Sequence, residues 1–188
     1  MLLSACDSQL VLVDYQARLM PAIDDASNVL RNAHILAQIA QLSGVPIIST
    51  EQRPKKLGHN PPALQGQRTL VKNHFSAVPD GLADWLRSPV QDATAPPNPA
   101  PTSRNDIVIA GCEAHVCLLQ TALDLVAEEF IVWVVSDACG SRSPRNRDAA
   151  FDRLARAGAH LVTTEMVGFE WLRTSDHPAF RDFQALIR

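Results

Sequence analysis

Three side chains of this 188-residue chain carry the chemistry of a hydrolytic centre, and each lies at or just beyond the end of a predicted buried strand. Asp14 ends the apolar run QLVLVD, Lys72 ends the run RTLVK, and Cys117 follows the run DIVIA. A thiol can attack a carbonyl carbon, a carboxylate can accept and return a proton, and an ammonium group favours nearby negative charge. Together the three residue types indicate covalent catalysis.

The segment Asn105–Leu125 is predicted to hold a buried strand, a tight turn and a helix. Asp106–Ala110 is apolar and β-branched, as in a parallel strand covered on both faces, and Gly111 ends it. From His115 onward, apolar residues recur at helical spacing. Cys117 is then expected in the first turn, where the helix dipole favours thiolate over thiol. The alternative is a buried structural cysteine.

Strand-like and helix-like segments alternate along the whole chain, which predicts a parallel sheet with helices on both faces. Strands are expected at 9–14, 45–49, 68–72, 106–110, 130–137 and 160–163, and helices at 24–43, 79–87, from 115, 144–157, 165–172 and 178–187. Asp25 or Ser27 and Ser143 are the expected N-caps. We therefore expect one α/β domain over residues 1–188, a three-layer αβα fold with six parallel strands in the order 3-2-1-4-5-6. That order makes strands one and four neighbours at the switch point, so Asp14 and Cys117 should face each other.

Two long segments between these elements are expected to be loops. Thr50–Gly66 is polar and follows the second strand, at the sheet edge where ligands bind. Ser88–Arg104 holds five of the thirteen prolines and is expected to be a surface loop. A lid or an interface arm is the alternative for this second segment.

Composition limits the function classes. The net charge is −3, and the chain has no basic run beyond Arg142, Arg145 and Arg147, which gives no reason to expect a nucleic-acid partner. No apolar run approaches the roughly 18–20 residues of a membrane span, and the N-terminus reads as the lead-in to a strand. The four cysteines show neither zinc spacing nor a disulfide framework. We expect a cytoplasmic protein that acts on a small molecule and contacts no membrane.

The segments VLVDYQ, VKNHFSA and AGCEAHVCLLQTALDL resemble, in order, the three motifs of the isochorismatase-like cysteine hydrolases. TEQRPKKLG and VVSDACGSRS are similar to the subgroup of isochorismatase domain-containing proteins. The resemblance implies a Rossmann-like hydrolase fold, a homo-oligomer and a catalytic triad of Asp14, Lys72 and Cys117. It also implies a cis peptide bond at Cys112–Glu113, with the backbone N–H groups of Glu113 and Cys117 forming the oxyanion hole.

The sequence departs from two branches of this family. Nicotinamidase members carry an Asp-x-His metal motif where this chain has Thr50-Glu51-Gln52. His59 and His74 lie nearby without metal-ligand spacing, so we expect neither a metal nor another cofactor. Isochorismate-cleaving members lack the nucleophilic cysteine, which argues against isochorismate as the substrate.

Five further residues are candidates for substrate binding by their position in the sequence: Tyr15, Glu51, Gln52, Phe75 and His115. His115 lies two residues before Cys117, and residues two apart on a helix point to different sides, so it is not expected to be the base. The arginines at 142, 145 and 147 could meet an anionic substrate, but such residues more often pair with Asp148, with Asp152 or with a neighbouring subunit. Cys112 and Cys139 are expected to be packing residues.

These observations predict a cysteine hydrolase that cleaves a small amide or related C–N substrate through a thioester-type intermediate. Two alternatives stay open: a metal-assisted amidase of the nicotinamidase kind, and a binding protein that keeps the fold without turnover.

Overall fold

Six parallel strands form one sheet in the computed structural model, which describes residues 1–88 and 104–188. The strands are β1 (Ser8–Val13), β2 (Ile47–Gln52), β3 (Arg68–Lys72), β4 (Asp106–Gly111), β5 (Ile131–Val135) and β6 (His160–Val162). Their order is β3-β2-β1-β4-β5-β6, and every neighbouring pair is parallel. This is the predicted sheet. The expected Pro-rich surface loop falls almost wholly outside the described residues.

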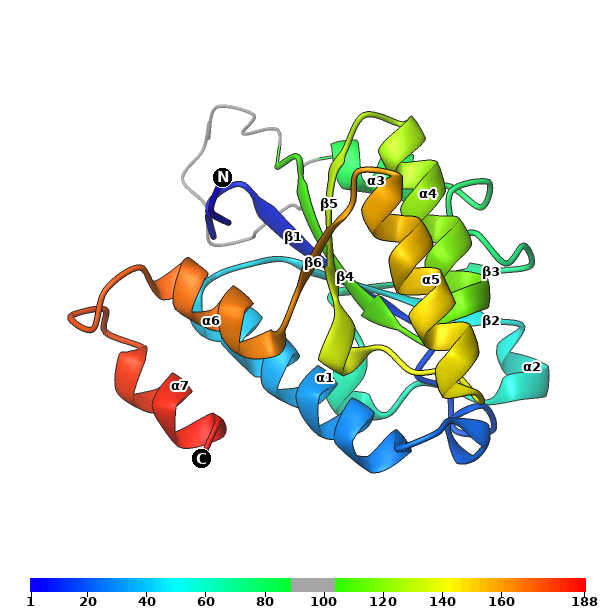
Figure 1. Cartoon of the computed structure of the whole chain (residues 1–188), viewed down its shortest axis with the longest axis horizontal. Helices are drawn as coiled ribbons and strands as arrows, with labels where there is room; N and C mark the ends of the chain where they lie inside the picture. The colour runs from blue at the N-terminus through cyan, green and yellow to red at the C-terminus, as the bar shows by residue number, and fades with distance from the viewer. Residues whose placement is uncertain (89–103) are drawn as a thin grey trace.

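Helices cover both faces of the sheet, as right-handed crossovers between parallel strands require. They are α1 (Ala26–Leu42), α2 (Pro54–Leu57), α3 (Leu82–Arg87), α4 (Leu119–Ala127), α5 (Pro144–Arg156), α6 (Thr164–Leu172) and α7 (Phe180–Leu186). Figure 1 shows α1 and α6 on one side of the sheet and α4 and α5 on the other. Among the described residues, no helix combines the length and the apolar character that crossing a membrane requires.

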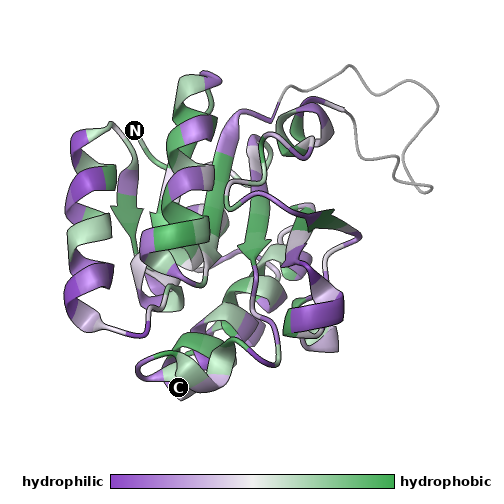
Figure 2. Cartoon of the chain, turned by 90° about the vertical axis from the view of Figure 1, so that its right-hand side faces the viewer, coloured by the Kyte–Doolittle hydropathy of each residue, from purple (hydrophilic) through white to green (hydrophobic). Residues whose placement is uncertain are grey.

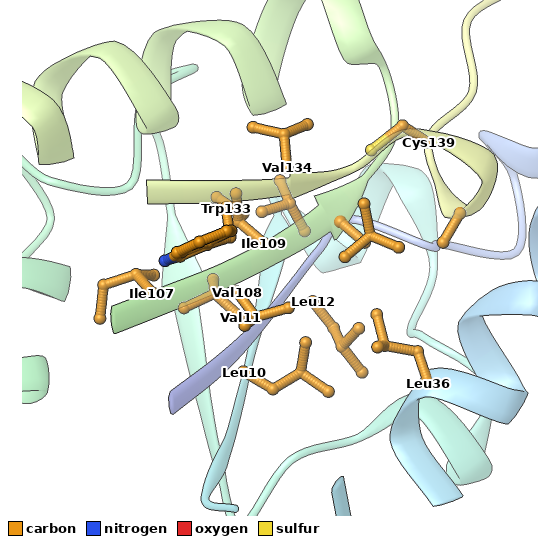
Figure 3. Packing of buried hydrophobic residues seen from close by; sticks show 14 of the residues in the cluster. Leu10, Val11, Leu12, Leu36, Ile107, Val108, Ile109, Trp133, Val134 and Cys139 are labelled. Carbon is orange, nitrogen blue, oxygen red and sulfur yellow. The ribbon is translucent and has the colours of Figure 1, made fainter. Parts of the chain in front are cut away.

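The core lies between the central strands and these helices. β1 and β4 are buried along their whole length, which explains their continuous apolar runs. Figure 3 shows Leu10 and Leu12 of β1 on the side of the sheet that faces Leu36 of α1. Apolar residues concentrate in the strands, whereas the helices mix apolar and polar residues (Figure 2). The carboxyl ends of β1 and β4, near which Asp14 and Cys117 lie, are therefore anchored in the packed core.

Gly111 allows β1 and β4 to approach closely where they end. A Cβ atom at this position would lie 2.3 Å from the Val13 carbonyl oxygen, closer than any real contact. Val13 pairs with both Gly111 and Thr50 in the sheet, so the ends of β1, β2 and β4 are held together. The close approach brings the residues after β1 and β4 to one place.

The segment Thr50–Gly66 is not the continuous loop that its polar composition predicts. Thr50–Gln52 continues β2 and pairs in register with Leu70–Lys72, and α2 and a 3₁₀ turn at Pro62–Leu64 follow. These polar side chains can be buried in a strand because each finds a hydrogen-bond partner, as described below. Composition alone could not show those partners.

Asp25 and Ser143 occupy the predicted N-cap positions, but neither side chain makes a capping hydrogen bond. Asp25 does occupy the N-cap position of α1, but its carboxylate accepts hydrogen bonds from the Asn28 amide and caps no backbone N–H. Ser143 precedes Pro144 at the start of α5 and likewise makes no side-chain cap. The strand predicted at 130–137 ends at Val135, because Ser136–Ala138 turns into a 3₁₀ helix.

Candidate functional site

The candidate site lies at the carboxyl edge of the sheet, around the ends of β1, β3 and β4. Asp14 is the first residue after β1 and has a φ of 54°, in the left-handed region that is uncommon for a residue other than glycine. Lys72 is the last residue of β3, and Cys117 lies in a π-helical turn, Ala114–Leu118, between β4 and α4. Three separate elements therefore supply the three side chains to one edge of the sheet.

Asp14 and Lys72 form a fully buried ion pair. The Lys72 Nζ lies 2.7 Å from the Asp14 Oδ2, and neither side chain is exposed. The other carboxylate oxygen, Oδ1, accepts a hydrogen bond of 2.7 Å from the Thr50 hydroxyl. These two partners hold the buried carboxylate in one orientation and offset the cost of its burial.

The Lys72 ammonium group donates to several further oxygens. Its Nζ lies 2.7 Å from the Gln52 Oε1, 3.0 Å from the Phe75 carbonyl oxygen and 3.3 Å from the His74 carbonyl oxygen. Together with Asp14, these acceptors replace the water that the charge loses on burial. The ammonium group is therefore held in place rather than free to swing.

Cys117 contacts this pair and is the member that solvent can reach, with 7% of the residue exposed. Burial and the adjacent Asp14 carboxylate raise the pKa of the Cys117 thiol to about 12, while Lys72 acts in the opposite direction. Burial and Asp14 therefore oppose the preference for thiolate that the helix start was expected to give. The helix dipole does not outweigh burial and a neighbouring negative charge. The balance of these effects favours a neutral thiol beside the ion pair.

The turn before Cys117 is fixed by backbone and side-chain bonds. The Cys112–Glu113 peptide bond is cis, as the resemblance implied. The Cys112 N–H donates to the Val13 carbonyl (2.9 Å), and the Ala114 N–H donates to the Gly140 carbonyl (2.7 Å). Within the described residues, the Glu113 N–H donates no hydrogen bond to the backbone or to a side chain. That group is thus free to donate to a ligand.

The Glu113 side chain is held by Arg142, a contact that the sequence analysis missed. The Arg142 Nη2 lies 2.6 Å from the Glu113 Oε1, and the Arg142 backbone N–H donates to Oε2 at 3.0 Å. Hydrogen bonds from Arg142 hold the pKa of the Glu113 carboxyl below its usual value. The strand order could have indicated this contact, because Arg142 follows β5, Glu113 follows β4, and the two strands are neighbours. The sequence analysis instead named Asp148 and Asp152 as acidic partners.

Thr121 is a second positioning residue that was not predicted. Its hydroxyl donates to the Cys117 carbonyl oxygen at 2.7 Å and accepts from the Ala77 N–H at 3.1 Å. It therefore ties the turn that carries Cys117 to the loop after Lys72. The only sequence signal is its spacing of four residues from Cys117 on a helix.

Two of the five predicted binding residues do not face the site. The Tyr15 hydroxyl is buried and donates to the Ala138 carbonyl at 2.6 Å, and burial raises the pKa of the phenol. Glu51 points to the face of β2 opposite Thr50, where it binds the His59 ring at 2.9 Å and the Asn60 N–H at 2.8 Å. Both side chains have partners within the protein, and these contacts lend no support to the predicted substrate contacts.

Of the other three predicted binding residues, Gln52 and Phe75 lie next to Lys72, whereas His115 contacts residues that follow β5. Gln52 touches Lys72 directly, and Phe75 is 55% exposed next to it. The His115 ring contacts the Ser141 hydroxyl at 3.0 Å and the Asn146 amide at 3.4 Å. Those contacts direct the imidazole toward the loop after β5, which agrees with its exclusion as the base.

The residues that could hold a metal ion do not come together. His59 contacts Glu51 at 2.9 Å, whereas His74 contacts Asp80 at 3.1 Å. Within residues 1–88 and 104–188, no three histidine, cysteine, aspartate or glutamate side chains form a metal-binding group. The donor set of a nicotinamidase-type site is thus not assembled. Cys112 and Cys139 are buried, and burial raises the pKa of both thiols.

The fold and these residues define a class: a doubly wound parallel-sheet protein with a buried Asp–Lys–Cys group at the switch point. Residues 8–166 match the model of the isochorismatase domain, and the chain belongs to the isochorismatase family. It is 36% identical over 185 residues to isochorismatase domain-containing protein 2A of Mus musculus, covering 96% of this chain and 82% of that protein.

Solved structures give the same result. A protein described as the MAR1 ribonuclease from Caenorhabditis elegans superposes with a TM-score of 0.86 and 31% identity, over 100% of this chain and 92% of that one. YcaC from Pseudomonas aeruginosa, described with hexane-2,5-diol and covalent acrylamide, gives 0.84 and 28%, over 99% and 90%. YcaC from Escherichia coli, described as an octameric hydrolase of unknown specificity, gives 0.79 and 25%, over 100% and 95%.

Proposed function

We propose that this chain is a cysteine hydrolase that cleaves a small amide or related C–N compound. Cys117 is the nucleophile, Asp14 is the general base and acid, and Lys72 holds the positive charge. The observation that carries the proposal is the buried Asp14–Lys72 pair, at 2.7 Å, in contact with the thiol. A buried ion pair next to a thiol that solvent can reach can accept the thiol proton and stabilise the charge that develops during attack.

In the first half-reaction, the Cys117 sulfur attacks the substrate carbonyl carbon while its proton passes to Asp14. The neutral resting thiol makes this transfer part of the attack rather than a step before it. The carbonyl oxygen gains the negative charge, and the Glu113 and Cys117 N–H groups are its proposed donors. The C–N bond then breaks, Asp14 returns the proton to the nitrogen, and a thioester on Cys117 remains.

In the second half-reaction, water attacks the thioester carbon and gives a proton to Asp14. The C–S bond breaks, the acid leaves, and the proton returns to the Cys117 sulfur. The Lys72 Nζ, 2.7 Å from the Asp14 Oδ2, stabilises the carboxylate whenever the proton is elsewhere. One carboxyl group thus serves both halves of the reaction.

The comparisons support this proposal at the level of the class. The E. coli relative is described as a hydrolase, and the P. aeruginosa relative is described with a covalent acrylamide, a compound whose electrophilic double bond reacts with nucleophiles such as thiols. The E. coli relative is described as octameric, which supports a homo-oligomer here too. Four free cysteines agree with the proposed reducing, cytoplasmic setting. Light scattering of the purified chain and cell fractionation test these last two proposals.

The decisive experiment is a screen of small amides, ureas and nicotinamide with the wild type, Cys117→Ala and Cys6→Ala. Cys6 is exposed and is the matched control. Hydrolysis by the wild type and Cys6→Ala, lost in Cys117→Ala, is expected. A mass increase on Cys117 after rapid acid quenching would identify the thioester.

Other outcomes would favour other functions. Activity that a chelator abolishes would indicate the metal-assisted amidase. RNA cleavage that survives Cys117→Ala would place a different activity elsewhere on the molecule. Binding of a compound without turnover, equal in wild type and Cys117→Ala, would favour a silent binding protein.

A further inference from the structure

A hollow of about 330 Å³ lies next to the candidate site, over the ends of β2 and β3. It is lined by Gln52, Arg53, Lys56, Leu57, Asn73 and Phe75. Figure 1 shows α2, which carries Lys56 and Leu57, beside the ends of these two strands. A larger hollow of about 400 Å³ lies between α1 and α7 and involves none of the residues around Cys117.

Two residues that line the hollow contact the catalytic lysine. The Gln52 Oε1 and the Phe75 carbonyl oxygen both accept hydrogen bonds from the Lys72 Nζ, at 2.7 and 3.0 Å. The Arg53 backbone N–H donates to the Lys72 carbonyl at 3.1 Å, so Arg53 is anchored to the same residue. Gln52 is 8% exposed and forms the floor, with the exposed residues around it. A ligand in the hollow would thus be separated from Lys72 by one layer of residues.

The hollow carries positive charge that no acidic side chain balances. Arg53 and Lys56 make no ion pair among the described residues. The nearby acids are already engaged: Glu51 binds His59 and Asn60 on the opposite face of β2, and Asp80 binds the His74 ring and two backbone N–H groups. Two free cations at one small hollow favour an anion.

The hollow also presents an aromatic ring. Phe75 is 55% exposed, although it directly follows residues whose backbone is tied to Asp80 and Lys72. An exposed phenylalanine on an anchored loop, beside the half-buried Leu57, offers contact to a flat apolar group. The ring and the two cations together specify one kind of ligand.

We infer that this hollow is an anion subsite and that the substrate is a small C–N compound bearing a carboxylate on a flat apolar group. The inference rests on the proposed function, because it takes the reacting carbonyl to lie at Cys117. Arg53 and Lys56 would bind the carboxylate, and Phe75 and Leu57 would contact the apolar part. Attraction of the anion would raise the rate of encounter as well as the affinity.

The test compares two alkylating reagents that differ only in charge. They are 4-(iodoacetamido)benzoate, which has a ring and a carboxylate, and its uncharged counterpart iodoacetanilide. The rate of Cys117 alkylation by each is read by mass spectrometry in the wild type, Arg53→Gln/Lys56→Gln and Lys55→Gln. Lys55 is the matched control, because it is exposed on the same short helix and does not line the hollow.

The expected result is a preference for the anionic reagent at Cys117 that falls about tenfold in the double variant at low ionic strength. Lys55→Gln should leave the preference unchanged, and Cys6 should show the same ratio in all three proteins. Circular dichroism verifies that the double variant is folded. We expect it to fold, because Arg53 and Lys56 are exposed and their replacement removes no core contact.

The other outcomes separate the two proposals. Alkylation of Cys117 by both reagents, with a ratio that the double variant does not change, would overturn the subsite and leave the nucleophile intact. An equal fall in Lys55→Gln would also overturn it, because a general positive field would then explain the preference. If neither reagent alkylates Cys117 in the wild type while Cys6 reacts, the proposed function fails, and the subsite with it.

Discussion

The Lys72 ammonium group reaches the Asp14 carboxylate, at 2.7 Å, from a strand that is not its neighbour. β2 lies between β1 and β3, and two of its side chains contact the pair: Thr50 binds Asp14, and Gln52 binds Lys72. The polar end of β2 is therefore a bridge between the two charged residues. Its side chains allow an ion pair to be buried between residues of β3 and of the segment after β1, with β2 in between.

The pair should show its burial in stability measurements. Lys72→Met leaves the Asp14 carboxylate buried with Thr50 as its hydrogen-bond donor, so we expect a loss of about 3 kcal/mol in the free energy of unfolding. The double variant Lys72→Met/Asp14→Asn should lose less than the sum of the single losses, because no unpaired charge remains. Urea denaturation gives these values. Lys55→Met, at an exposed position, is the control, and a loss there equal to that of Lys72→Met would contradict the argument.

Asp14→Asn should change the thiol and the turnover in opposite directions. The Asp14 charge raises the Cys117 pKa, so its removal lowers that pKa from about 12 and increases the thiolate fraction at pH 9. Iodoacetamide should then alkylate Cys117 faster, about tenfold for each unit by which the pKa falls.

Amide hydrolysis by the same variant should fall at least about 100-fold, because the general base is lost. Lys72→Met should slow both alkylation and hydrolysis, since Lys72 lowers the thiol pKa. Slower alkylation in Asp14→Asn would show that the carboxylate does not act on the thiol as described.

Tyr15→Phe tests whether Tyr15 is a structural residue. Its buried hydroxyl donates to the Ala138 carbonyl, and removing it leaves that oxygen without this partner. We expect a loss of about 1–2 kcal/mol in stability, with KM for any identified substrate unchanged. A raised KM with unchanged stability would restore Tyr15 to the binding site.

The Glu113–Arg142 contact should appear as a pH dependence of stability. The folded-state pKa of Glu113 is lowered, so its contribution is complete above the unfolded value of about 4.3 and is lost as the pH falls through the lower folded value. Between about pH 5 and 3, Arg142→Gln should therefore lose less stability than the wild type. Urea midpoints across this range provide the comparison. Arg145→Gln, at an exposed position in the first turn of α5, should follow the wild type.

Local sequence patterns were sufficient for the framework. Apolar runs and helical periodicity depend on neighbouring residues, so they predicted the six strands and the ends at which Asp14, Lys72 and Cys117 lie. The strand order came from the rule for doubly wound folds. Polar strands were the exception, since the partners that allow Thr50–Gln52 to be buried lie in other segments.

Only the tertiary structure decided the state of the site. Whether Cys117 rests as thiol or thiolate depends on burial and on the distance to a carboxylate about one hundred residues earlier in the chain. In the same way, the partner of Glu113 is an arginine 29 residues later, and Glu51 faces away from the site because of the strand's alternation. Desolvation and Coulomb energies follow distances in space, which the order of residues does not contain.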